Sequence, residues 1–206
     1  MIIGITGNIG SGKSTFSKFL YNFLKKNYKV NLISADKIGH RVIEKDDIKE
    51  KLINRWGTSI LKGNFIDRVK VRKLVFSNKE EYNFLCLLVW PEILREIKEL
   101  IKPFSINLIE AAILVEAKWH KICDLVILVD APFSKRFLRK PFLSLKEFLL
   151  INSYQFPSSV LEVYSNYIVK NNSSLKNLKS QAKLISDLIS FRIFKKFNKN
   201  KSFYCF

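Results

Sequence analysis

Residues 7–14 constrain the fold of this chain more than any other feature of its sequence. They run Gly-Asn-Ile-Gly-Ser-Gly-Lys-Ser and fit the pattern Gly-x-x-x-x-Gly-Lys-Ser/Thr. The preceding residues 1–6 are mainly apolar, which predicts a short buried strand. In residues 14–26, apolar side chains recur at spacings of three and four, which predicts a helix with one apolar face. A buried strand, a glycine loop and a helix in this order favour an α/β fold with a parallel sheet.

The residue types in this loop suit the binding of phosphate groups, and a chance match at a glycine turn would not have the flanking strand and helix. Glycines let the backbone turn around an anion without Cβ clashes, and successive N–H groups then point at its oxygens. The positive end of the following helix lies at the same place. We expect Lys13 to reach the β- and γ-phosphates of ATP and the Ser14 hydroxyl to hold Mg²⁺. The residues expected to bind the nucleotide here are Gly10, Ser11, Gly12, Lys13, Ser14 and Thr15.

Further strands and helices alternate along the rest of the chain. Apolar runs predict strands at residues 30–34, 106–112, 125–130 and 167–169. Helical spacing predicts helices within residues 38–56, 67–76, 79–89 and 145–154, with a kink or a new helix at Pro91. A last amphipathic helix is expected from Leu175, Leu178, Ala182, Ile185, Leu188 and Ile189. We therefore predict a P-loop NTPase fold of the nucleotide-kinase type, with a central parallel sheet covered on both faces.

The chain is expected to form a single domain over residues 1–206. Residues 46–102 show helical patterns without a strand, which predicts a helical lobe inserted between two strands of the sheet. The segment that begins at Lys195 is basic and aromatic, and we expect it to be frayed or loosely docked.

The formal net charge of +18 has two interpretations. One is an anionic partner, such as nucleic acid or a polyphosphate, and the other is a lysine-rich coding bias. The lysines are scattered along the chain, which favours the bias and makes nucleic acid an unlikely partner. The cysteines at 86, 123 and 205 are far apart and indicate neither a zinc site nor a disulfide framework, so a cytoplasmic setting is expected. The apolar stretches are too short for a membrane span.

Asp36 lies just past the carboxyl end of the second predicted strand. In open parallel sheets, ligands bind outside the carboxyl ends of the strands. A carboxylate at that place can orient and deprotonate an attacking hydroxyl. The residues alone favour equally a second interpretation, in which Asp36 caps the helix that follows.

A series of further motifs accompanies the loop and Asp36, which ends a Ser-Ala-Asp motif. In chain order these are Phe-Ile-Asp-Arg at 65–68, Leu-Val-Phe at 74–76, Trp-Pro-Glu-Ile at 90–93, Glu-Ala-Ala-Ile-Leu-Val-Glu at 110–116, Val-Asp-Ala-Pro at 129–132, Tyr-Gln-Phe-Pro at 154–157 and Tyr-Ile-Val-Lys-Asn-Asn at 167–172. Together, over residues 2–178, they resemble the dephospho-coenzyme A kinase family, which has Asp-Ala-Asp where this chain has Ser-Ala-Asp.

The resemblance implies ATP-dependent phosphorylation of the ribose 3′-hydroxyl of dephospho-coenzyme A, with ATP and dephospho-coenzyme A as partners. It implies that Asp36 orients the hydroxyl while Lys13 and Arg139 neutralise the charge on the phosphoryl group. The residues that it implies for contacts with bound molecules are Arg68 and Glu116 for the acceptor and Asn172 for the adenine. Without the resemblance, Arg68 is equally a solvated helix charge, and Glu116 is equally a helix cap.

The resemblance also implies that residues 46–102 bind the acceptor and that residues 133–156 form a short lid. This lid departs from the family, because residues 140–144 lack the usual second arginine and a further lid arginine falls on Leu150. Trp90 stands where the family has histidine. Two alternatives therefore stay open: another small-molecule or nucleotide kinase, and a basic nucleotide-binding protein with weakened transfer.

Overall fold

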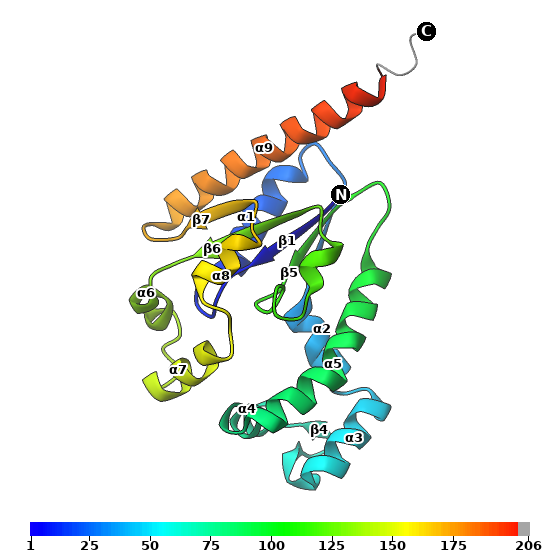
Figure 1. Cartoon of the computed structure of the whole chain (residues 1–206), viewed down its shortest axis with the longest axis vertical. Coiled ribbons are helices and arrows are strands. Elements are labelled where there is room, and N and C mark those ends of the chain that lie inside the picture. Colours follow the sequence, from blue (N-terminus) through cyan, green and yellow to red (C-terminus); the bar gives the residue numbers. More distant parts are fainter. Residues whose placement is uncertain (202–206) are drawn as a thin grey trace.

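The computed structural model describes the backbone of residues 1–201 and the side chains of residues 1–195. Within that part of the chain, a five-stranded sheet has the order β2-β5-β1-β6-β7, and all its neighbouring strands pair in parallel. The strands are β1 (Ile2–Thr6), β2 (Val30–Ser34), β5 (Ile106–Glu110), β6 (Leu125–Asp130) and β7 (Tyr167–Lys170). Every predicted strand is present, and the prediction of a central parallel sheet is confirmed. Figure 1 shows β1 inside this sheet, with helices around it.

One face of the sheet packs against the first and the last helix. α1 (Lys13–Leu24) buries Phe16, Leu20 and Leu24, which recur every four residues and therefore share one face of the helix. They join Ile3 and Ile5 of β1 in one hydrophobic cluster, together with residues of α9 (Leu175–Lys201). Figure 1 shows α9 running along this side of the sheet, beside α1.

The apolar face predicted for the last helix is largely correct. The residues of α9 that enter the cluster are Leu178, Ala182, Ile185 and Ile189. Leu175 and Leu188 were expected on the same face but are exposed. Leu175 is the first residue of the helix, and Leu188 lies about a quarter of a turn away from the buried row.

The opposite face of the sheet packs against the segment between β2 and β5. It contains α2 (Ala35–Val42), α3 (Asp46–Trp56), α4 (Arg68–Ser77) and α5 (Lys79–Leu100). A second hydrophobic cluster joins Ile33 and Ile109 of the sheet to Ile38 of α2 and Ile93 of α5. Figure 1 shows that α3 and α4 lie away from the sheet, beyond the end of α5.

The prediction that residues 46–102 contain no strand is wrong. Two short strands, β3 (Leu61–Lys62) and β4 (Phe65–Ile66), pair in antiparallel fashion. Gly63 takes a positive φ of 60° in the turn between them, a conformation that glycine adopts without strain. Two-residue strands are too short to leave an alternating pattern, which is why only the turn is visible in the sequence.

The helices of this segment also differ in their limits from the predicted ones. The helical pattern at residues 38–56 comprises two helices, because α2 ends at Val42 and the backbone of Lys45 is extended before α3. At Pro91 no new helix begins: α5 is a single helix of 22 residues that continues through the proline, although the ring removes one backbone donor.

Between β6 and β7 lie α6 (Phe133–Leu138), α7 (Leu145–Ser153) and α8 (Ser158–Val163). Pro132 precedes α6 as predicted, whereas α8 was not predicted. A capping box fixes the start of α7, since Ser144 and Glu147 satisfy each other's backbone N–H groups. The division into one domain with a lobe at 46–102 and a lid at 133–156 stays a prediction.

The first part of the expected loose tail, residues 195–201, continues α9, which ends at Lys201, the last residue that the structure describes. Cys205 and the rest of residues 202–206 lie outside the described residues. None of the described helices combines the length and the apolar character needed to cross a membrane.

The packing of α1 gives a stability prediction. Replacing the fully buried Leu20 by alanine should lower the free energy of unfolding by about 2–5 kcal/mol, because apolar contacts are lost and a cavity remains. Leu184 of α9, which is 59% exposed, is the matched control, and its change to alanine should alter stability by less than about 0.5 kcal/mol. Urea denaturation of both variants measures the difference, and equal values would contradict this account of the core.

Candidate active site

The loop between β1 and α1 has a conformation that requires its glycines. Gly10 and Gly12 have φ values of 77° and 94°, in the left-handed region. A Cβ atom at Gly10 would collide with the Arg136 carbonyl, and one at Gly12 would collide with the Asn171 side chain. The loop is therefore enclosed by backbone and side chains from α6 and from the segment after β7.

Two arginines and an asparagine donate hydrogen bonds to the backbone carbonyl oxygens of this loop. Arg139 donates to the carbonyl oxygens of Gly10 at 3.2 Å and of Ser11 at 3.3 Å. The buried Asn171 side chain donates to the same Ser11 oxygen at 2.8 Å. Arg136, also buried, donates to the Ile9 carbonyl at 3.4 Å. These donors fix the carbonyl side of the loop, and the first N–H groups of α1 lie at the end of the helix that attracts an anion.

Lys13 is buried at the first turn of α1. Burial lowers the pKa of its ammonium group, the charges of Asp36 and Glu110 oppose this shift, and Lys140 adds to it. These charges therefore act on Lys13 from neighbouring positions. A buried cation at the phosphate loop is well placed to bind the oxygens of a phosphate group.

Ser14 meets a carboxylate that was not recognised as a site residue in the sequence. Its hydroxyl donates to Oε1 of Glu110, the last residue of β5 and a buried one. Strand β5 lies beside β1, so that its carboxyl end reaches the start of α1. A hydroxyl and a carboxylate at this place form an oxygen-rich pair beside the phosphate loop.

Asp36 lies in the first turn of α2 and borders two hollows. The first, which we name the phosphate-side cleft, is about 460 Å³ in volume, and its lining includes Ser14, Lys18, Asp36, Arg41 and Glu110. The second, which we name the lobe-side cavity, is about 450 Å³ and lies between α2, α4 and α5. Asp36 is thus the carboxylate shared by the cleft next to the phosphate loop and the cavity next to the lobe.

The lobe-side cavity has a cationic part and an apolar part. Arg68 and Arg72 of α4 line it, one helical turn apart. Burial lowers the pKa of the neighbouring His40, and the charges of the two arginines lower it further, while Asp36 opposes them. The apolar lining includes Phe76, Tyr82, Leu85, Val89, Trp90 and Ile93. Such a cavity suits a molecule that carries both an anionic group and an extended apolar or aromatic part.

Glu116 lies near this cavity but is engaged elsewhere. Its Oε1 accepts a hydrogen bond of 2.8 Å from the backbone N–H of Phe156. Its Oε2 is buried and has no hydrogen-bond partner among the described residues. Burial raises the pKa of Glu116, although backbone N–H groups oppose the shift. One oxygen of this carboxylate therefore supports the loop before α8, and the other is left for a further donor.

The loop at residues 154–157 connects α7 to both the phosphate loop and the lobe. Oε1 of Gln155 accepts from the N–H of Ile9 at 2.8 Å, and the Asn8 side chain donates to the Phe156 carbonyl at 2.9 Å. On the other side, the ring centroid of Tyr154 lies 4.3 Å from that of Tyr82, which lines the lobe-side cavity. This segment therefore contacts both the phosphate loop and a residue of the lobe-side cavity.

The structure brings some of the predicted site residues together and separates others. Lys13, Ser14 and Asp36 lie around the phosphate-side cleft and the start of α1. Arg68 lies in the lobe-side cavity, and Arg139 contacts the loop backbone. The side chain of Asn172 is exposed, and its backbone carbonyl oxygen accepts a hydrogen bond from Lys135. Thr15 is half-buried in the first turn of α1.

Three residues with clear contacts were missed as site residues: Glu110, Arg136 and Asn171. Glu110 had a signal, because an acidic residue that ends a buried strand lies at the edge where the phosphate loop is expected. Asn171 had none, because Asn172 follows it directly and only the fold decides which of the two turns inward. Arg136 had none either, because the sequence does not show that α6 packs against the phosphate loop.

These features define a class of protein: a P-loop kinase, with a glycine loop between β1 and α1 and a carboxylate facing it across a cleft. The family model for dephospho-CoA kinase matches residues 1–177. The chain therefore belongs to the dephospho-CoA kinase family.

Individual proteins agree with this assignment. The dephospho-CoA kinase of Fusobacterium nucleatum is 32% identical over 184 residues, which cover 86% of this chain and 93% of that protein. The structure of dephospho-CoA kinase from Campylobacter jejuni is similar with a TM-score of 0.64 at 26% identity, over 92% of this chain and 96% of that one. A crystal structure of a Thermus thermophilus protein is similar with a TM-score of 0.70 at 30% identity, over 91% and 97% of the two chains.

The crowding at Gly10 gives a prediction for nucleotide binding. In the variant Gly10→Ala the new methyl group would meet the Arg136 backbone, so the loop must shift, and affinity for MgATP should fall at least about tenfold. Gly63→Ala is the matched control: φ is also positive there, but nothing lies within 4 Å of the added methyl. It should cost stability of about 1–2 kcal/mol and leave nucleotide affinity unchanged. Calorimetric titration checks both, and unaltered affinity in Gly10→Ala would contradict the enclosed loop.

The raised pKa of Glu116 predicts a pH effect. The folded protein binds a proton on this group more tightly than the unfolded chain does, so its contribution to stability is present at low pH and is lost as pH rises through the folded pKa. The variant Glu116→Gln cannot titrate there. Its stability relative to the natural protein should therefore increase as pH rises from about 4, the ordinary value for glutamate, and then level off. Urea denaturation between pH 4 and 8 checks this, and a constant difference would refute it.

Proposed function

We propose that this protein phosphorylates the ribose 3′-hydroxyl of dephospho-coenzyme A with ATP and so forms coenzyme A. The observation that carries the proposal is the place of Asp36, on the border between the phosphate-side cleft and the lobe-side cavity. A hydroxyl group presented from the cavity would meet this carboxylate on its way to the phosphate loop. Family membership supplies the identity of the acceptor.

The proposed reaction is a displacement at the γ-phosphorus of ATP. The acceptor hydroxyl forms the new P–O bond, the bond to ADP breaks, and Asp36 orients the hydroxyl and takes its proton. Lys13 stabilises the charge that the transferred group carries. The loop N–H groups, including those of Gly12 and Thr15, bind the other phosphate oxygens.

Arg139 was expected to neutralise phosphoryl charge directly. Its guanidinium donates to Gly10, to Ser11 and, at 3.0 Å, to the Asn171 carbonyl. We propose that it acts on the phosphates by fixing the loop, and that Lys140, whose charge already acts on Lys13, supplies the lid cation. A lysine provides a point charge, whereas the arginine that the family has in the lid provides a planar, bidentate hydrogen-bond donor.

Mg²⁺ fits the residues at the cleft. Ser14 and Glu110 present a hydroxyl and a carboxylate together, the oxygen ligands that Mg²⁺ prefers. Among the residues whose side chains are described, no group of three or more His, Cys, Asp or Glu is arranged to hold a metal. We therefore propose that Ser14, with Glu110 beside it, holds Mg²⁺ together with nucleotide phosphates and water. When bound, the ion neutralises charge on the β- and γ-phosphates.

On the acceptor side, we propose that Arg68 binds an anionic phosphate group of dephospho-coenzyme A in the lobe-side cavity. The free Oε2 of Glu116 is proposed to accept a hydrogen bond from the acceptor. Asn172 stays a proposed adenine contact, made through its exposed side chain or backbone. The cytoplasm, where ATP and reduced thiols are available, is the proposed location.

The experiment incubates the purified protein with MgATP and dephospho-coenzyme A and detects coenzyme A by mass. The natural protein should form coenzyme A, and chelation of Mg²⁺ with EDTA should stop the reaction. Asp36→Asn keeps the size of the side chain and should lower kcat by about 10²–10⁴-fold, because the proton acceptor is lost. Lys13→Ala should abolish transfer while the protein stays folded.

Nucleosides and nucleotides serve as competing acceptors in the same assay. Preference for one of them would replace the proposed substrate. Binding of ATP without phosphorylation of any acceptor would indicate a nucleotide-binding protein that has lost transfer. Full activity of Asp36→Asn would remove the proposed role of this carboxylate.

A further inference from the structure

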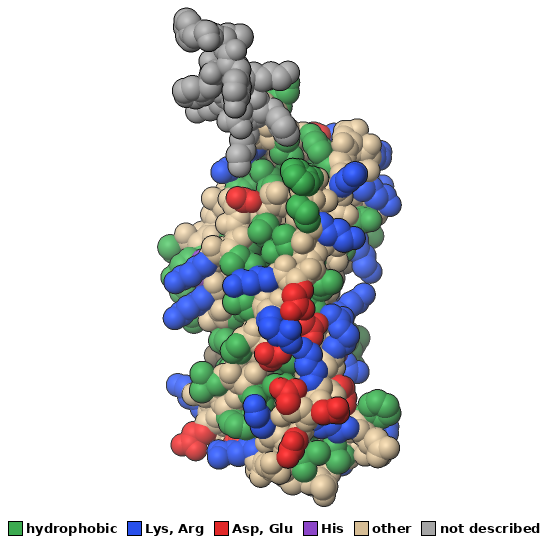
Figure 2. Space-filling view, turned by 90° about the vertical axis from the view of Figure 1, so that its right-hand side faces the viewer, with side chains coloured by type: hydrophobic (Ala, Val, Ile, Leu, Met, Phe, Trp, Pro, Cys, Tyr) green, Lys and Arg blue, Asp and Glu red, His purple; other side chains and the backbone are tan. Residues whose placement is uncertain are grey.

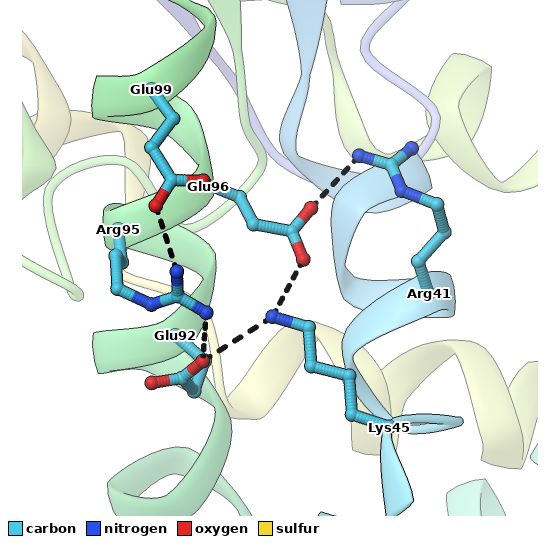
Figure 3. A network of polar contacts seen from close by, with 6 residues as sticks. All are labelled: Arg41, Lys45, Glu92, Arg95, Glu96 and Glu99. Atoms are coloured by element: carbon cyan, nitrogen blue, oxygen red, sulfur yellow. Dashed lines mark hydrogen bonds and ion pairs between the residues drawn. The ribbon is translucent and has the colours of Figure 1, made fainter.

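A network of ion pairs joins α2, which carries Asp36, to α5 of the lobe (Figure 3). Glu96 accepts hydrogen bonds from Arg41 at 2.9 Å and from Lys45 at 2.8 Å. Lys45 also reaches Glu92 at 3.3 Å. On the outer side, Arg95 pairs with Glu92 at 2.8 Å and with Glu99 at 2.7 Å. Glu96 of α5 therefore binds two cations, Arg41 in α2 and Lys45 just after it.

The arrangement follows from helical geometry. Glu92 and Glu96 are four residues apart on α5 and therefore lie on one side of that helix. Arg41 lies in the last turn of α2, and Lys45 lies three residues beyond the end of α2, where the extended chain leads into α3, so both cations reach this side of α5. The chain has 36 basic and only 18 acidic residues. The lysine-rich composition therefore does not explain why Glu92, Glu96 and Glu99 lie close together on α5. Figure 2 shows red and blue side chains close together over the middle and lower part of the α5 side.

Glu96 differs from the outer members of the network in its burial. Its side chain is 15% exposed, whereas those of Arg95 and Glu99 are 52% and 59% exposed. Burial opposes the ionisation of Glu96, but hydrogen bonds from Lys45 and Arg41 outweigh it and lower its pKa. A charged group that is partly desolvated and bonded to two cations holds its partners more firmly than an exposed pair does.

The network continues an apolar contact between the same helices. Ile38 and Val42 of α2 and Ile93 and Ile97 of α5 are buried in one cluster. α2 has only eight residues, and the ion pairs fasten its end while the apolar residues fasten its middle. It is therefore fixed to α5 along most of its length.

This attachment matters because α5 also forms a wall of the lobe-side cavity. Val89, Trp90 and Ile93 of α5 line that cavity, and Asp36 lies at its border. Arg41, which Glu96 holds, lines the phosphate-side cleft together with Ser14. We propose that Glu96 is a positioning residue: by holding Arg41 and Lys45 it keeps α2 on α5 and so places Asp36 between the acceptor and the phosphate loop. This inference rests on the proposed function.

The test compares Glu96→Gln with Glu99→Gln, a matched change one turn further along α5. Glu96→Gln should lower kcat for coenzyme A formation about tenfold, because displacement of a catalytic group by a fraction of an ångström weakens transfer. Its KM for MgATP should stay within about twofold, since the phosphate loop is untouched. Glu99→Gln, which loses only an exposed pair with Arg95, should match the natural protein in both constants.

A double-mutant cycle separates positioning from a general loss of stability. Arg41→Met removes the other half of the main pair at an exposed side chain and should also lower kcat. If Glu96 acts through Arg41, the double variant should be little worse than the more impaired single variant. Thermal unfolding of each protein shows that all are folded at the assay temperature. Should Glu96→Gln fail to fold, Arg41→Met and Lys45→Met carry the test in its place.

The outcomes are distinct. An unchanged kcat in Glu96→Gln and Arg41→Met, with coenzyme A still formed by the natural protein, would overturn the positioning role alone. Additive effects in the cycle, or a loss in Glu99→Gln as large as that in Glu96→Gln, would do the same. Failure of the natural protein to form coenzyme A would overturn the proposed function and this inference together.

Discussion

The crowded backbone around the phosphate loop is the constraint on which the rest of the structure depends. Gly7, Gly10 and Gly12 each lie against a different element: the end of β6, the helix α6 and the segment after β7. These elements are brought to the loop by the parallel pairing of β1 with β6 and of β6 with β7. The loop can therefore face an anion only when strands more than 100 residues away in the sequence are in register. The glycine motif is necessary for a phosphate-binding loop, but the pairing of the strands brings the elements that hold the loop in its conformation.

Much of the fold could be predicted because its signals are local. The strands of a parallel sheet covered on both faces are nearly continuous apolar runs, and all five appear in the sequence as such. The glycine loop has a specific pattern, and Asp36 stands directly after a strand. Where the prediction was wrong, the element was too short to leave a sequence pattern, or the surrounding structure outweighed a local preference. The β3–β4 hairpin has two residues in each strand. At Pro91, where a kink or a new helix was predicted, the new helix is excluded, because α5 continues through the proline despite one lost backbone donor.

The remaining parts of the candidate site depend on contacts that no sequence pattern encodes. Asn171 and Asn172 are neighbours, and only the end of β7 decides that the first points at Ser11 while the second is exposed. Arg136 and Arg139 both contact the loop, because they are three residues apart and share one side of α6 and its end. Glu110 meets Ser14 because β5 is the neighbour of β1, a fact of topology and not of local propensity.

The two sides of the proposed reaction are held by different parts of the chain. Residues after β6, namely Arg136, Arg139 and Asn171, fix the phosphate loop, whereas α5 fixes α2 and the carboxylate of Asp36. The sides meet through β5, which pairs with β1 on one side and with β2 on the other. Since β2 leads directly into α2, the register of these three strands sets the position of Asp36 relative to Lys13, and the α2–α5 contact sets its position relative to the lobe-side cavity. Because α2 is attached both to the sheet through β2 and to the lobe through α5, it can hold the Asp36 carboxylate in place relative to both the nucleotide and the acceptor of the proposed reaction.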